Sequence, residues 1–193
     1  MGMPEIAPPA QRWTAAMVRA LPEDGKRYEV IAGELLVTPA PSFDHQEAVV
    51  RLWARLDPYL TSHLVGRAAC APADIEFDEH TLVQPDVFVV PLVGGRRPKR
   101  WSDIETLVLA VEVLSPSTAR ADRTVKRRLF QRVRIPEYWI VDVEARLVER
   151  WRPDDERPEI VTETLIWQPD ASALPMEIDL AGYFAEVLDE PVG

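Results

Sequence analysis

The sequence predicts an α/β domain with a mixed central sheet, flanking helices and an N-terminal hairpin. Three observations favour this class. The chain of 193 residues suits one hydrophobic core. Two long segments have helical apolar spacing, and short apolar segments with strand character separate them. The strand–helix–strand run at 107–143 would be a right-handed crossover if its strands are parallel. We expect residues 1–10 to be a Pro-rich flexible lead and residues 11–193 to form the domain.

The first half of the chain predicts two helices and a hairpin. A short helix is expected at 11–20, followed by a hairpin at 28–39 that turns near Ala32-Gly33. A long helix at 43–60 follows, because apolar residues recur there at helical spacing. They are Val49, Leu52, Trp53, Leu56 and Leu60. The next predicted elements are two strands, 66–77 and 82–91.

The second half predicts a buried strand, a basic helix and another hairpin. Residues 94–100 read as a loop, and LVLAVEVL at 107–114 reads as a central strand because both of its faces are apolar. Ser115-Pro116-Ser117 breaks this strand and can cap a helix at 118–134. The remaining predictions are a hairpin of strands 137–143 and 146–152, and an acidic, Pro-rich tail with a helix near 180–188.

The charge distribution points to one basic segment in an acidic protein. The net charge is −10, yet residues 96–134 hold eleven Lys/Arg against four Asp/Glu. Such a segment can contact phosphates, although charge alone favours the simpler interpretation of a solvated helix face. No apolar run approaches the ~18 residues of a membrane span, and Cys70 is the only cysteine. We therefore expect a cytoplasmic protein without a membrane partner.

Three charged residues occupy positions where the pattern calls for apolar ones. Glu112 is the only polar residue in its strand, and Asp86 opens the apolar run VFVV directly after Pro85. On a helical wheel, Lys126 falls inside the apolar stripe, while most neighbouring arginines face outward. The chain has three lysines against nineteen arginines, so the inward position uses the rarer cation. Lys can hold a water, whereas Arg is the usual choice for structural ion pairs.

These residues predict a metal-dependent hydrolytic site. Two carboxylates from neighbouring strands suit Mg²⁺ or Mn²⁺, which would neutralise phosphate charge and activate water. Lys126 would orient or deprotonate that water. A buried pair of Lys126 with Glu112 or Asp122, without chemistry, is the alternative. The outward arginines are candidates for contacts with flanking phosphates. They are Arg120, Arg123 and Arg127, together with the loop RRPKR.

Three further residues are accessory candidates. His45 opens the inward stripe of the first long helix, where it could approach the site or serve as a structural histidine. Glu34 follows the hairpin turn and is either an outer metal ligand or an exposed acid. Asp122 shares the inward face of its helix, but an acid in the first turn also suits the helix dipole, which we favour. Trp53, Trp139 and Trp151 read as core residues rather than base-stacking platforms.

The motifs YEVIAGEL, VQPDVFVV, VEVLSPST and PEYWIVD resemble a large bacterial family of restriction-endonuclease-like proteins in the PD-(D/E)XK nuclease superfamily. The resemblance runs from about residue 13 to LPMEIDLAGYF. It implies the restriction-endonuclease-like fold and metal binding by Asp86 and Glu112, with the Val113 carbonyl as a further candidate ligand. The superfamily's usual lysine position holds Leu114 here. In this family the lysine lies on the following helix, which matches Lys126.

The leading hypothesis is a Mg²⁺-dependent endonuclease that cleaves nucleic acid, with DNA favoured as the substrate. A homodimer is expected because cutting two strands requires two sites. A catalytically weak or inactive nuclease-fold module that binds nucleic acid or protein is the alternative, favoured by the charge of −10. A structural protein with a buried ion network is the third interpretation.

Overall fold

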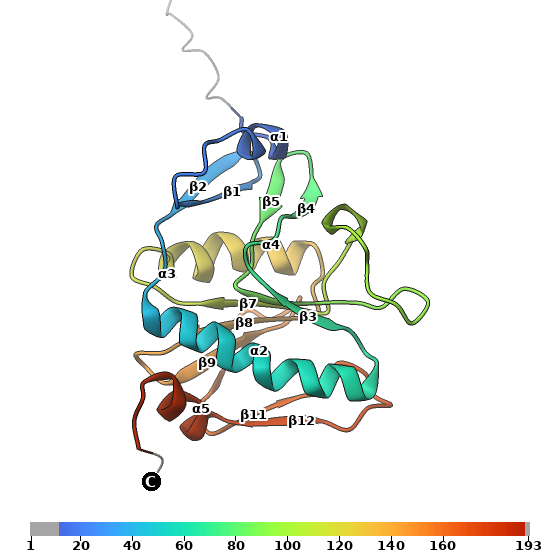
Figure 1. Cartoon of the computed structure of the whole chain (residues 1–193), viewed down its shortest axis with the longest axis vertical. Coiled ribbons are helices and arrows are strands. Elements are labelled where there is room, and N and C mark those ends of the chain that lie inside the picture. The colour runs from blue at the N-terminus through green and yellow to red at the C-terminus, as the bar shows by residue number, and fades with distance from the viewer. Residues whose placement is uncertain (1–11, 192–193) are drawn as a thin grey trace, which may run out of the picture.

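A computed structural model of the chain describes residues 12–191 (Figure 1). The predicted lead at 1–10 lies outside the described residues. At the centre is a six-stranded sheet in the order β10-β9-β8-β7-β6-β3. Only β7 and β8 pair in parallel, which confirms the predicted mixed sheet. The strands are β3 (Arg67–Cys70), β6 (Val87–Val90), β7 (Leu109–Val113), β8 (Glu137–Asp142), β9 (Leu147–Trp151) and β10 (Glu159–Val161).

A smaller sheet of order β2-β1-β5-β4 contains the predicted N-terminal hairpin. Its turn is made by Ala32 and Gly33, both with positive φ, as a two-residue hairpin turn requires. The short helix α1 (Ala15–Arg19) packs on this sheet. The strands are β1 (Arg27–Ile31), β2 (Glu34–Thr38), β4 (Ile75–Asp78) and β5 (Thr81–Val83).

The two strands predicted at 66–77 and 82–91 are in fact four, so those boundaries were wrong. Each predicted strand is divided between the two sheets: β3 and β6 belong to the large one, β4 and β5 to the small one. Pro72 and Pro85 lie at the breaks, where a residue without an N–H cannot continue a ladder. Residues 84–86 therefore carry the chain from one sheet into the other.

Helices cover both faces of the large sheet (Figure 1). Helix α2 (Phe43–His63) lies on one face with α5 (Leu180–Val187) and the two-stranded sheet of β11 (Thr164–Trp167) and β12 (Met176–Asp179). Helix α4 (Arg127–Arg132) covers the other. In β7 the odd-numbered residues face α2, so alternation turns Glu112 toward α4. None of the helices in the described part is long and apolar enough to span a membrane.

The helix predicted at 118–134 is interrupted by a π-helical turn. The chain forms α3 (Ala119–Ala121), a π-helical turn η2 (Asp122–Lys126) and then α4. Both ends of the turn, Asp122 and Lys126, are buried, in agreement with the helical wheel. Such turns interrupt α-helices frequently at functional sites.

The acidic tail is more regular than the sequence predicted. It contributes β10, β11 and β12 before the expected helix α5. These strands are three or four residues long and are bounded by polar and proline residues, so their alternation is too short to distinguish from loop. The short 3-10 helix η1 (Trp101–Asp103) was also not predicted.

Candidate active site

A cavity of about 300 Å³ opens where the two sheets meet the N-terminus of α2. Asp86, at the entry to β6, and Glu112, in β7, both line it. Since Val87 pairs with Val111, extending the register by one residue sets Asp86 opposite Glu112. The other charged or titratable residues of the lining are Arg27, His45 and Lys126. The cavity thus contains the three residues that the sequence singled out.

Asp86 is held by three donors around its buried carboxylate. The guanidinium of Arg27 lies 2.6 Å from Oδ1, while His45 Nε2 and the Val113 N–H lie 3.1 and 2.9 Å from Oδ2. Burial opposes ionisation of Asp86, but the hydrogen bond from His45 and the charge of Arg27 outweigh it. They hold the pKa of this carboxyl below its ordinary range. Asp86 is therefore a fixed negative charge.

Lys126 is the centre of a buried ion cluster. Its Nζ lies 2.8 Å from Glu29, 2.9 Å from Glu112 and 3.8 Å from Asp122. An ammonium has three N–H groups, and two of them suffice for the closer carboxylates. Because Lys126 also lines the cavity, its third N–H can serve a water or a phosphate oxygen there. The ammonium is the only cation in direct contact with these acids within residues 12–191.

The cluster has more carboxyl groups than cations. Burial lowers the pKa of Lys126, but Glu112, Glu29 and Asp122 outweigh burial and raise this pKa above its usual value. Burial raises the pKa of Glu112 well above its usual value, despite Lys126. Burial also raises the pKa of Asp122 to about 6. A single ammonium therefore does not neutralise the acids around it.

Arg27 and Glu29 are site residues that the sequence analysis missed. Both lie on β1 at alternate positions, so their side chains share one face. Glu29 is buried, with its other oxygen accepting from the Gln84 N–H at 2.7 Å. One sequence feature could have identified them. Two ionisable residues alternate along the strand on the same face as Ile31, which is buried.

The accessory candidates have different outcomes. His45 lies in the site, where it holds Asp86. Asp122 lies behind Lys126, and neither of its oxygens has a hydrogen-bond partner. Glu34 is exposed at the turn end of β2 and does not line the cavity. The hairpin's carboxylate comes instead from Glu29, on the preceding strand.

The three arginines proposed for phosphate contacts lie outside the cavity. Arg120 is exposed at the start of the helix. Arg123 pairs with Glu149 at 2.6 Å and with Asp142 at 3.0 Å. The guanidinium of Arg127 stacks 4.7 Å from the ring centroid of Trp151. A contact of Arg123 with phosphate would compete with its two carboxylate partners.

The donor set suits a hard divalent cation, although it is small. No group of three or more His, Cys, Asp or Glu side chains in residues 12–191 is arranged to hold a metal. Two carboxylates, Asp86 and Glu112, do face the cavity, and Mg²⁺ often takes only one or two from a protein. The two oxygens of Asp122 that lack partners, and the excess of acids around Lys126, are consistent with a further positive charge nearby.

Comparisons with known proteins agree with this fold. A crystal structure described as a "putative nuclease belonging to DUF820" from Anabaena variabilis superposes with a TM-score of 0.71. It is 19% identical and covers 91% of this chain and 99% of its own. No curated protein matches the chain. The family model of Uma2, described as "Putative restriction endonuclease", matches residues 15–181. The chain therefore belongs to the Uma2 family and has its mixed α/β, nuclease-like architecture.

Proposed function

We propose that the protein is a divalent-metal-dependent endonuclease that hydrolyses phosphodiester bonds, with DNA as the substrate. The observation that carries this proposal is the convergence of Asp86, Glu112 and Lys126 on one cavity. Membership of a family described as "Putative restriction endonuclease" supports it. We further propose that the protein acts in the cytoplasm as a homodimer, because two strands of a duplex require two sites.

Each residue of the site would have a distinct role. Asp86 and Glu112, with the Val113 carbonyl, would hold Mg²⁺ or Mn²⁺, which when bound polarises the phosphate and acidifies water. Lys126 would donate its third N–H to the attacking water or to a phosphate oxygen, and so stabilise negative charge. Arg27 and His45 would position Asp86, while Glu29 would fix the lysine.

Nicking of supercoiled plasmid DNA with Mg²⁺ or Mn²⁺ tests the proposal. Wild type should cut, Asp86→Ala should neither bind Mn²⁺ nor cut, and Lys126→Ala should bind Mn²⁺ without cutting. Loss of a group that acts only in the transition state costs on the order of 10²–10³ in rate. Lys26→Ala is the matched control, since Lys26 is an exposed lysine paired with Asp24.

Lys126→Ala leaves two buried carboxylates without their cation, so its thermal unfolding must be checked. Lys126→Arg retains the charge and provides a second variant. Full cleavage by folded Lys126→Ala would contradict the role of this lysine. Absence of any cleavage by metal-loaded wild type would contradict the enzymatic proposal itself.

One observation favours the alternative, a nuclease-fold module that binds nucleic acid or protein without cutting it. Both oxygens of Asp86 already have partners, and a metal would compete with Arg27 and His45 for them. Calorimetric titration with Mn²⁺ separates the two functions. The enzyme should bind the ion through Asp86, whereas a non-catalytic module should bind DNA or a protein partner and show no metal binding.

A further inference from the structure

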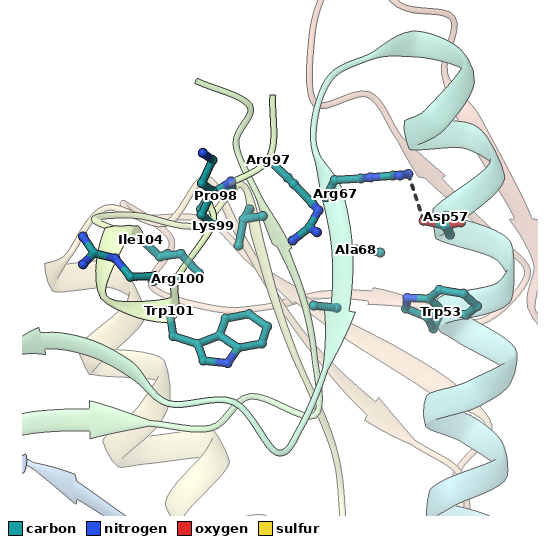
Figure 2. A pocket seen from close by; sticks show the side chains of 12 residues that line it. Trp53, Asp57, Arg67, Ala68, Arg97, Pro98, Lys99, Arg100, Trp101 and Ile104 are labelled. Atoms are coloured by element: carbon teal, nitrogen blue, oxygen red, sulfur yellow. Dashed lines mark ion pairs between the residues drawn. The ribbon is translucent and has the colours of Figure 1, made fainter. Parts of the chain in front are cut away.

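A second and larger cavity lies at the edge of the central sheet and shares no lining residue with the candidate active site. It has a volume of about 510 Å³ and crosses β3, the edge strand (Figure 2). We name it the edge groove. Figure 2 shows Trp53, from α2, and Trp101, from η1, on opposite sides of β3. Its floor includes the small side chains of Ala68 and Ala69.

The edge groove is basic in an acidic protein. Among the residues that the structure describes, four cationic side chains line it, and Asp57 is its only acid. Asp57 lies 3.5 Å from Arg67, and Arg100 pairs with Asp103 at 2.7 Å, outside the lining. The two remaining cations, Arg97 and Lys99, are exposed and form no ion pair with any residue in 12–191. They are free to bind an anion.

The aromatic residues of the groove are partly uncovered. Trp101 is 48% exposed and makes a T-shaped contact with Phe88. Trp53 is half-buried, contrary to the core position predicted for it. Trp139 and Trp151, in contrast, are buried as predicted. Unpaired cations beside accessible indole rings are the combination that proteins use to hold single-stranded nucleic acid, where phosphates meet the charges and bases stack.

The groove is placed within reach of a bound strand. Residues 86–90 connect the two cavities, because Asp86 lines the first and Val90 the second. At ~3.3 Å per residue this is about 13 Å. A stacked strand advances 3.4 Å per nucleotide, so a segment of about four nucleotides or more is long enough to reach from one cavity to the other around the buried β6.

We infer that the edge groove binds an unpaired, single-stranded segment that flanks the cleavage position in the nucleic acid substrate. Arg97 and Lys99 contact its phosphates, and Trp101 and Trp53 stack on its bases. This inference rests on the proposed function for the identity of the ligand. Binding at the groove is independent of cleavage, so the two can fail separately.

Fluorescence anisotropy with a fluorescein-labelled 12-nucleotide DNA strand, in EDTA, tests the inference without turnover. Arg97→Ala/Lys99→Ala should weaken binding about tenfold and reduce the slope of log K against log salt by ~1.4, which is two contacts at ~0.7 each. Trp101→Ala should weaken binding about fivefold or more. Arg132→Ala/Arg157→Ala removes the same charge from exposed positions outside the groove and should leave binding unchanged.

The outcomes separate the two proposals. Wild-type binding that the groove variants leave unchanged overturns the inference, even if Asp86-dependent cleavage is present. Loss of binding in the groove variants supports it, even if no metal-dependent cleavage is found. If the same variants instead abolish dimers in sedimentation and leave DNA affinity unchanged, the groove is an interface between copies and the inference is wrong.

Discussion

Asp122 is the acid in the cluster with the fewest stabilising contacts. Both of its oxygens are buried without a hydrogen-bond partner, and Lys126 is 3.8 Å away, engaged by two closer carboxylates. Burial raises its pKa from 3.8 to about 6. The folded state thus holds a proton that the unfolded chain releases near pH 4. Ionisation of Asp122 should therefore destabilise the fold.

Asp122→Asn should stabilise the metal-free protein above pH 6. Since the folded pKa is raised, wild-type stability falls as the pH rises from about 4 to about 6 and remains lowered above that. A shift of two units corresponds to about 3 kcal/mol, an upper value for the gain. Urea unfolding in EDTA at pH 5 and pH 8 measures it. A variant less stable than wild type at pH 8 would show that Asp122 is needed as an anion.

The residues that could be predicted from the sequence are those that violate a strong pattern. Glu112 and Lys126 are charged inside apolar periodic segments, so their burial was visible without coordinates. Arg27 and Glu29 lie on a short strand whose flanks are not uniformly apolar, and a charge there looks ordinary. Their role depends on the packing of one sheet against the other, which no local pattern encodes.

At the level of elements, the junction between α2 and β3 depends on a glycine. A Cβ at Gly66 would lie 2.7 Å from Val89 Cγ1 and 2.9 Å from the Val90 carbonyl oxygen. The second contact is with backbone and cannot be relieved by a rotamer change. This close approach lets β3 pair with β6 directly after the helix, and so places the edge groove.

Gly66→Ala should lower the free energy of unfolding by about 1–3 kcal/mol, the usual cost of forcing an extra methyl group into a packed site. Chemical denaturation monitored by tryptophan fluorescence would measure the loss. Removing a glycine also restricts the unfolded chain, which by itself favours folding by ~0.4–1 kcal/mol. A stabilised variant would therefore mean that β3 moves freely, and that the edge groove is not rigid.

The element boundaries that were wrong have a common cause. Residues 66–91 contain apolar segments that read as two strands, yet the chain changes sheets twice within them. Periodicity reports that a residue is extended, but not which sheet it joins. The π-helical turn could not be predicted from the sequence either, because a π-helical turn has no residue composition that distinguishes it from the α-helix around it. The strand–helix–strand run from β7 to β8 was predicted from the sequence, with a crossover conditional on parallel strands, and the two strands do pair in parallel.

For the molecule as a whole, the acids at the cavity couple metal binding to stability. Glu29, Asp86, Glu112 and Asp122 bring four carboxyl groups to the region of Lys126 and Arg27, within a chain of net charge −10. A divalent cation that binds the folded state offsets this excess. The unfolded chain separates the acids and loses the site, so the ion should favour the folded state.

Mg²⁺ or Mn²⁺ at 100 times its Kd should therefore raise the free energy of unfolding by about 2.7 kcal/mol, and EDTA should reverse the gain. Thermal unfolding over a metal titration measures this without any substrate. Glu112→Gln should remove most of the response, because it deletes one of the two carboxylates that face the cavity among residues 12–191. Glu156→Gln is the matched control, since Glu156 is exposed and does not line the cavity. Equal stabilisation of both variants would mean that the ion binds elsewhere on the acidic surface, and Glu112 would lose its assignment as a ligand.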